Sequence, residues 1–180
     1  GIDLQGQEDL RKRFRNIEGV RGEMTLNQNE SFYTSGFFAI IEKKISNIIA
    51  RVSFRQDIHK IKFDNFNSGG NGEKDISIFS PNLSLNYNIS NSTSTYVRLG
   101  TGFETPSLNE LSANPNRESG FNNELKSQNT KEIEFGLKTK TKKFKSSLAL
   151  FSSRTTNEIL PYEIDDYPGQ NFYSNTGKVN

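Results

Sequence analysis

The sequence predicts an all-β protein, an antiparallel transmembrane β-barrel, and contains about eight up-and-down strands of it. Apolar and polar side chains alternate in several short segments, which is the pattern of strands with two different faces. The connections between these segments are alternately long and short. Mean hydropathy is only −0.72 and no apolar run approaches the ~18 residues of a spanning helix, so a membrane protein with this composition has to cross with strands.

Composition excludes several other classes of protein. The net charge is +2 and no basic block is present, so nothing indicates nucleic-acid binding. The chain has no cysteine, which excludes a disulfide framework and a cysteine-based zinc or redox site. The first residue is Gly1 rather than methionine and the last, Asn180, falls inside a strand pattern. We therefore expect residues 1–180 to be a piece of a longer protein.

The first part of the chain contains three predicted strand segments, of which the third alternates most regularly. Residues 1–8 are predicted as the end of a strand, and the charged, irregular residues 9–30 as a long connection. Residues 32–42 are rich in β-forming side chains but have apolar residues on both faces, and residues 43–47 are a predicted turn. Residues 48–54 alternate regularly, with Ile48, Ala50, Val52 and Phe54 opposed to Arg51, Ser53 and Arg55.

The middle of the chain continues the same alternation. Beyond Gln56 the phase is lost, as expected for a bulge or for an extension above a bilayer. The glycine-rich residues 65–74 predict a flexible loop. Residues 81–89 are the most regular predicted strand, and residues 90–94 are a tight turn into a strand over residues 96–103.

The last part of the chain has two long connections. Pro106 cannot donate to a ladder, so pairing should end near it, and the polar segment that follows is predicted as a loop as far as Gln128. Strands are predicted over residues 132–138 and 144–150, with a short turn between them. A second long loop then precedes a strand that starts at Phe172. Long connections on one rim and short turns on the other are typical of transmembrane barrels rather than soluble sandwiches.

The charged side chains predict which face is the lumen. Glu132, Glu134 and Lys138 share one side of a strand, and a lysine facing lipid at mid-membrane costs roughly 2–4 kcal/mol. The opposite side should therefore face lipid, and the barrel must be closed because hydrocarbon leaves no strand group unpaired. The residues predicted to face the lumen are Arg51, Arg55, Tyr96, Arg98, Glu132 and Glu134. They could contact a plug or a ligand, or only keep the interior solvated.

Residues 100–111 resemble the strand-and-loop motif G-x-x-x-G-F-x-x-P-x-x-x-E-L of TonB-dependent outer-membrane receptors. The matching positions are Gly102, Phe103, Pro106, Asn109, Glu110 and Leu111. Residues 122–128 and 132–137 resemble the family's N-x-x-L-K-x-E and E-x-G-L segments in the same order, although Gln128 replaces an acidic residue. Leu148–Phe151, Asn157–Ile159 and Tyr173–Lys178 extend the resemblance over roughly the last half of the chain.

The resemblance implies a larger object than this chain. Receptors of this family form 22-stranded barrels that are closed by an N-terminal plug. Residues 1–180 would be about a third of such a barrel, without the plug domain and the C-terminal strands. The implied partners are the lipid bilayer of the outer membrane, the protein's own plug, the TonB system acting through the plug, and a ferric siderophore or similar ligand.

No catalytic or cofactor site is indicated. His59 is the only histidine, and no cluster of metal ligands or nucleophile arrangement accompanies it. The extracellular loops could contact a ligand or cation, although a charged loop is usually just solvated. The ligand-contacting candidates are Arg117, Glu118, Phe121, Tyr162, Glu163, Asp165, Asp166 and Tyr167.

The function predicted from these observations is uptake of a scarce nutrient, foremost a ferric siderophore or other metal chelate, by a TonB-dependent outer-membrane receptor. Heme, cobalamin and glycans are further ligands that the resemblance allows. A passive porin-like channel would have the same strands without a plug. A soluble β-rich binding or adhesin module would pack its apolar faces on each other. An outer-membrane enzyme would need catalytic groups that the sequence lacks.

Overall fold

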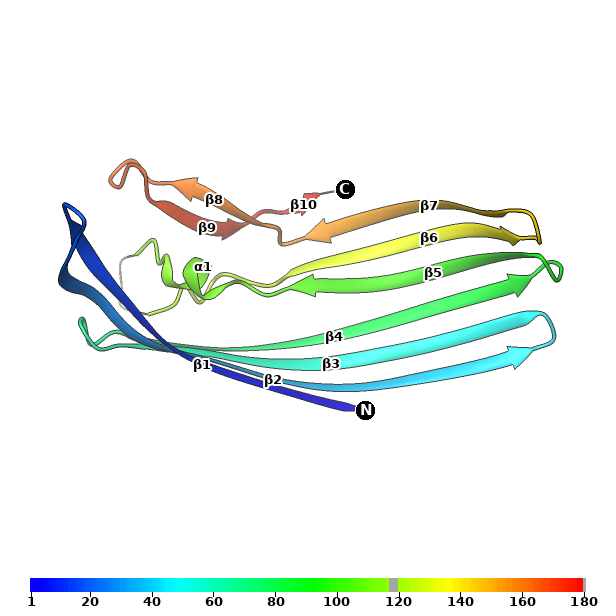
Figure 1. The fold of residues 1–180 in the computed structure, drawn as a ribbon, viewed down its shortest axis with the longest axis horizontal. Helices are drawn as coiled ribbons and strands as arrows, with labels where there is room; N and C mark the ends of the chain where they lie inside the picture. The colour runs from blue at the N-terminus through cyan, green and yellow to red at the C-terminus, as the bar shows by residue number, and fades with distance from the viewer. Residues whose placement is uncertain (117–119, 180) are drawn as a thin grey trace.

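The computed structural model describes residues 1–116 and 120–179 and places eight of its strands in one antiparallel sheet (Figure 1). Each strand pairs with the next along the chain, except that β7 pairs with β10. Between β7 and β10 the chain forms a separate hairpin of β8 and β9. The elements are β1 Ile2–Ile17, β2 Val20–Ile45, β3 Ile48–Asn65, β4 Asn71–Asn88, β5 Thr93–Glu104, α1 Leu108–Ser112, β6 Gln128–Lys140, β7 Lys145–Thr156, β8 Ile159–Glu163, β9 Asn171–Asn175 and β10 Lys178–Val179.

The connections sort to two opposite ends of the sheet (Figure 1). At the short-turn end, tight turns join β2 to β3, β4 to β5 and β6 to β7. At the long-loop end lie the tip of the β1–β2 hairpin, the loop at residues 66–70, the segment that contains α1, and the β8–β9 hairpin. This sorting is the one that the sequence predicts for a barrel wall.

One face of the sheet is apolar and exposed. A continuous cross-strand row runs from Ile41 through Val52, Leu83 and Leu99 to Ile133, each side chain opposite the next. These side chains share one face, so the predicted strands do not pack on one another as a soluble sandwich would require. The apolar band consists of exposed residues on this face, among them Ile2, Leu4, Phe37, Ile41, Val52, Phe54, Ile58, Phe79, Leu85, Tyr87, Val97, Leu99, Ile133, Phe135, Leu137, Leu148 and Leu150.

Charged pairs mark one limit of the apolar band. Just beyond Ile58 on the same face, Lys60 lies opposite Asp75 and Lys62 lies opposite Glu73. The Nζ atom of Lys62 is 2.9 Å from Oε2 of Glu73, and this hydrogen bond lowers the pKa of Glu73 below its ordinary value. On β3 the band therefore runs from Ile48 to Ile58, which is about the 9–11 residues that a strand needs to cross a bilayer.

The opposite face of the same strands is polar. Arg51, Ser84, Arg98 and Glu134 lie opposite one another across β3, β4, β5 and β6. All six predicted lumen-facing residues lie on this polar face. The face is not uniformly polar, because it also contains exposed apolar side chains from β2 and β7, namely Phe38, Ile40 and Phe151.

Two predicted connections are strand extensions in the structure. Residues 9–30, predicted as an irregular connection, continue β1 and β2 to a tight turn at Glu18 and Gly19, both with positive φ. The predicted loop at residues 65–74 contracts to residues 66–70, and β3 continues in register beyond Gln56 without a bulge. Strands that stand beyond the membrane are wet on both faces, so their side chains do not alternate.

The ladder between β4 and β5 ends early. The two strands pair only from Leu83 opposite Leu99 to the turn, although both continue further. Pro81 lies just past this point and has no N–H to donate. The Thr101 N–H is instead donated to Oδ1 of Asn82 (3.2 Å), and the Thr101 hydroxyl to the Pro81 carbonyl (2.9 Å). This stretch is the β4–β5 seam.

Replacing Asn82 with alanine is expected to lower the free energy of unfolding by about 1–3 kcal/mol, because the Thr101 N–H loses its acceptor in a wall that faces lipid. The measurement is the urea midpoint of the intact protein folded into phosphatidylcholine vesicles. Asn86→Ala is the control, since Asn86 lies on the same strand and face where the ladder is intact. Equal losses in the two variants would contradict this role of Asn82.

The buried apolar core lies at the long-loop end, on the polar side of the sheet. Ile61, Phe63 and Ile76 of β3 and β4 form its floor. Leu108 and Leu111 of α1, with Phe121 and Leu125 from the segment after it, form its cover. The described parts of the connection between β5 and β6, residues 105–116 and 120–127, therefore form a folded cap on the wall rather than an open loop.

Candidate functional site

The turn that contains α1 is fixed by its own sequence. Ser107 is the N-cap, and its hydroxyl accepts the N–H of Glu110, while Oε2 of Glu110 accepts the N–H of Ser107 at 2.7 Å. This reciprocal capping box closes the first turn of the helix. Leu108 and Leu111 then point into the core, and Pro106 is buried beside them. The motif positions at Pro106, Glu110 and Leu111 thus build this turn.

Polar contacts hold the same segment to the wall. Oδ1 of Asn109 accepts a hydrogen bond from Arg11 of β1 at 3.0 Å, and Arg11 also approaches Glu30 of β2 at 3.4 Å. On the other side, Nζ of Lys74 donates to the carbonyl of Asn123 at 2.9 Å. These hydrogen bonds therefore tie the segment directly to β1 and β4, besides its chain connections to β5 and β6.

The ligand-contacting candidates of this segment have different positions. Phe121 is only 5% exposed, and its ring packs on Phe63 with centroids 4.9 Å apart. Gly72 lies beneath both rings, where a Cβ atom would fall 2.5 Å from Cε1 of Phe63. In this arrangement the Phe121 ring packs between the cap and the sheet. Arg117 and Glu118 lie outside the described residues.

The β8–β9 hairpin carries the other candidates. Tyr162 and Tyr167 flank the buried ring of Phe172, with centroid distances of 6.1 and 6.2 Å. The carboxylate of Glu163 accepts the N–H of Gly169 at 3.3 Å, which closes the tip. Asp165 and Asp166 are exposed in that tip. The strand predicted to start at Phe172 is β9 of this hairpin, and the main sheet resumes only at β10.

The hairpin and the cap meet around a pocket of about 440 Å³. Asn175 joins them, because its Oδ1 accepts the N–H of Lys126 (2.7 Å) and its Nδ2 donates to the Lys126 carbonyl (2.8 Å). Of the sequence candidates that the structure describes, only Tyr162 lines this pocket. The other lining residues were missed because Asn-rich loops give no periodic signal; they include Asn122, Glu124, Tyr173, Ser174 and Asn175.

Ion pairs organise the polar face at mid-wall. Nε of Arg55 donates to both oxygens of Asp57 at 2.7 and 2.9 Å, and its Nη2 reaches Asp3 of β1 at 3.1 Å. Asp57 is only 2% exposed. Gly36 makes room for the guanidinium, since a Cβ atom there would fall 2.2 Å from Nη2 of Arg55. Arg51 pairs with Glu42 nearer the short-turn end.

A second network lies on β5 and β6. The hydroxyl of Tyr96 donates to Glu134 at 2.6 Å, and Nζ of Lys138 lies 4.7 Å from the centre of the Tyr96 ring. Gly136, opposite Tyr96, leaves the space that the ring occupies. Arg98 and Glu132 lie on the same face. Of the six predicted lumen residues, Arg51, Arg55, Tyr96 and Glu134 thus belong to separate local pairs, and Arg98 and Glu132 only share the same face.

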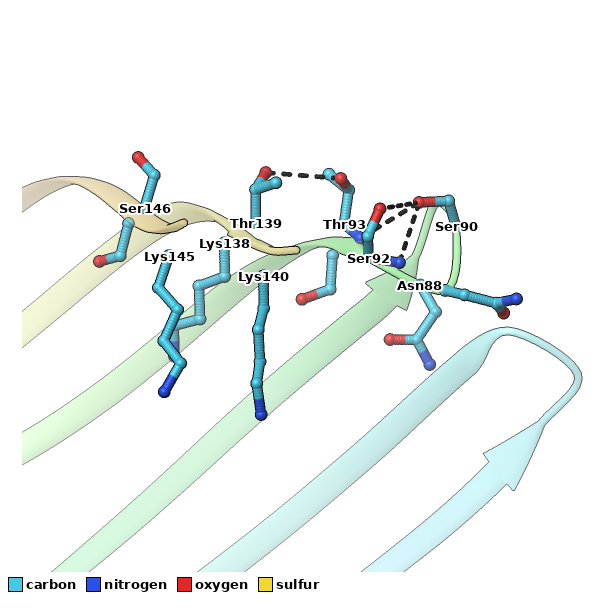
Figure 2. A pocket seen from close by; sticks show the side chains of 12 residues that line it. Asn88, Ser90, Ser92, Thr93, Lys138, Thr139, Lys140, Lys145 and Ser146 are labelled. Carbon is cyan, nitrogen blue, oxygen red and sulfur yellow. Dashed lines mark hydrogen bonds between the residues drawn. The ribbon is translucent and has the colours of Figure 1, made fainter. Parts of the chain in front are cut away.

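Lysines gather at the short-turn end around a pocket of about 470 Å³ (Figure 2). Lys138, Lys140 and Lys145 extend in the same direction, and Lys140 lies directly opposite Lys145. None of the three has an ion pair with another described residue. Ser90 closes the neighbouring turn by accepting the N–H groups of Ser92 and Thr93. This end of the polar face is therefore positively charged.

A sheet with one lipid-facing side, one polar side and loops sorted to two ends is the wall of a transmembrane β-barrel. No helix in the described part of the chain has the length and apolar character to cross a membrane. Residues 3–180 match the family model described as TonB dependent receptor-like, beta-barrel. The chain belongs to this family, whose members are outer-membrane receptors and transporters rather than enzymes.

Solved structures share the fold. The chain is similar to the alcaligin outer membrane receptor FauA from Bordetella pertussis (20% identity, TM-score 0.61, covering 84% of this chain and 26% of that one). It is also similar to the copper transporter OprC (16%, TM-score 0.72, 97% and 29%) and to the FrpB iron transporter from Neisseria meningitidis (12%, 0.61, 86% and 22%). The chain thus spans about a quarter of the length of these proteins. With the outer membrane as its location, the long-loop end is the extracellular one.

Proposed function

We propose that this chain supplies part of the barrel wall and of the extracellular loops of a TonB-dependent receptor that takes up a ferric siderophore or another metal chelate. The observation that supports this most directly is the pocket between the cap and the β8–β9 hairpin, which combines the aromatic rings of Tyr162 and Tyr173 with amide and hydroxyl groups. Aromatic and hydrogen-bonding groups of this kind suit a polar chelate with an organic framework. Receptors for alcaligin and transporters of iron and copper have the same fold.

The polar face has a role in the same proposal. A plug domain of the intact protein fills the lumen against this face, and the TonB system acts on the barrel through that plug. Lys138, Lys140 and Lys145 at the short-turn end have no ion pair with another described residue, and they offer positive charge to acidic groups of such a plug. Asp165 and Asp166 are exposed at the tip of the β8–β9 hairpin. In this proposal they are the first residues of the hairpin that an incoming ligand contacts.

The test is uptake and binding by the intact receptor in outer membranes, with a panel of ferric siderophores, heme, a copper chelate, cobalamin and a glycan. We expect one metal chelate to be taken up, and Tyr162→Ala to weaken its binding about tenfold because one aromatic contact is lost. Tyr87→Ala, which removes an exposed tyrosine of the apolar band, is the control. Uptake that persists unchanged in cells lacking TonB would instead indicate a passive channel.

A further inference from the structure

Two cations on the face of the apolar band have no counter-ion among the residues that the structure describes. Lys131 of β6 lies directly opposite Arg154 of β7, and both are exposed. Neither forms an ion pair with another described residue, whereas Lys60 and Lys62 on the same face each pair with carboxylates. Like charges directly opposite each other in a sheet are destabilising. An anion from outside the described chain would therefore relieve the repulsion between Lys131 and Arg154.

An apolar groove of about 520 Å³ lies beside these cations. It opens where the β4–β5 seam separates the two strands. Val52, Pro81, Leu83, Leu99 and Thr101 line it from the face of the apolar band, and Asn82, Gly100 and Glu132, which belong to the polar face, complete the lining. Lys131 lies at its edge, opposite Thr101 in the ladder. Hydrocarbon-like surface thus continues directly into positive charge.

The two features lie at the boundary of the lipid-facing surface. On β6 the exposed Ile133 is the neighbour of Lys131 on this face. On β7 the exposed Leu150 is followed by Ser152 and then by Arg154. Beyond the cations, Asn129 lies opposite Thr156 and continues this face as polar. Long basic side chains at such a boundary extend to the level of lipid headgroups.

We propose that the groove and the Lys131–Arg154 pair bind one anionic lipid of the outer leaflet, with its phosphate between the two cations and an acyl chain in the groove. A free inorganic phosphate would neutralise the cations but would leave the apolar groove unfilled. A zwitterionic lipid would fill the groove, but its headgroup has no net negative charge to neutralise the cations. The combination of both surfaces is specific for a chain-bearing anion. This proposal does not depend on which nutrient the receptor transports.

The test is native mass spectrometry of the intact receptor in detergent, titrated with dioleoyl phosphatidylglycerol and, separately, with dioleoyl phosphatidylcholine. We expect one phosphatidylglycerol to bind preferentially, and the double variant Lys131→Gln/Arg154→Gln to weaken its binding roughly 10- to 30-fold. The control, Lys60→Gln/Lys62→Gln, removes the same charge from the same face and should leave binding unchanged. Equal binding of the two lipids, or equal losses in the two double variants, would overturn the proposal.

A second variant separates the groove from the cations. Val52→Phe narrows the groove without changing charge, and it should weaken dioleoyl phosphatidylglycerol several-fold but leave dihexanoyl phosphatidylglycerol, which is too short to fill the groove, unaffected. Full competition by millimolar inorganic phosphate, together with no effect of Val52→Phe, would overturn the lipid site and leave only a surface anion site.

Discussion

Replacing Arg55 with leucine is expected to lower the free energy of unfolding of the intact barrel by about 3 kcal/mol, because it leaves the carboxylate of Asp57 without its cation. Asp57 is 2% exposed, and the only side-chain hydrogen bonds to its carboxylate in the described structure are the two from Arg55. A buried charge that loses its partner bears its full desolvation cost. Because Arg55 itself is partly exposed, we expect a loss at the lower end of the roughly 3–5 kcal/mol of stability that breaking a buried ion pair costs.

Urea unfolding in phosphatidylcholine vesicles measures this loss, and the same strand provides the control. Arg51→Leu breaks the ion pair with Glu42. The side chains of Arg51 and Glu42 are 57% and 46% exposed, so the free energy of unfolding should fall by no more than about 1 kcal/mol. The double variant Arg55→Leu/Asp57→Leu should recover most of the stability, since no charge is then left buried. Equal losses for Arg55→Leu and Arg51→Leu, or a double variant as unstable as Arg55→Leu, would be inconsistent with this account.

Replacing Phe121 with alanine leaves a cavity against Phe63. We expect this to lower the local stability of the cap by about 3–5 kcal/mol, so that the cap detaches from the sheet more often. The cap joins β5 to β6 by way of α1, and apolar contacts to β3 and β4 provide most of its attachment. The loss should appear as faster amide hydrogen exchange and faster proteolysis in residues 105–127, with the strands still protected.

Phe66→Ala is the matched control, because Phe66 is 62% exposed in the loop between β3 and β4 and should contribute little. The experiment also separates the two roles open to Phe121. Ligand binding that is lost while protection of residues 105–127 stays intact would show that the ring contacts the ligand directly, as the sequence analysis allowed. Loss of protection in the Phe121 variant alone assigns it to the cap.

The sequence predicts the membrane-crossing part of this fold well, because lipid on one face and water on the other impose a period of two. Residues 48–54 and 81–89 alternate visibly, and the structure places residues 48–54 in β3 and residues 81–88 in β4. Residues 9–30 were wrongly predicted as irregular. Their strands are wet on both faces, so what determines them is backbone pairing and the Glu18–Gly19 turn, which side-chain periodicity does not report.

The loops were harder for a related reason. The helix α1 has five residues, too few for a 3.6-residue period to emerge, and its burial of Leu108 and Leu111 depends on β3 and β4, which are distant in sequence. The charged hairpin tip at Asp165 was visible in the sequence. Asn122 and Asn175 lie in segments that resemble the family, but their place at the pocket was not predicted, because an asparagine that joins two loops looks locally like any other asparagine.

The short ladder between β4 and β5 has a mechanical consequence. It divides the wall into two panels that share few lateral hydrogen bonds toward the outside of the cell. The chain leaves the second panel at the end of β5 and buries Leu111 and Phe121 against Ile61 and Phe63 of the first. The cap thus links the two panels across the β4–β5 seam, and a force that lifts the cap also removes this link between them.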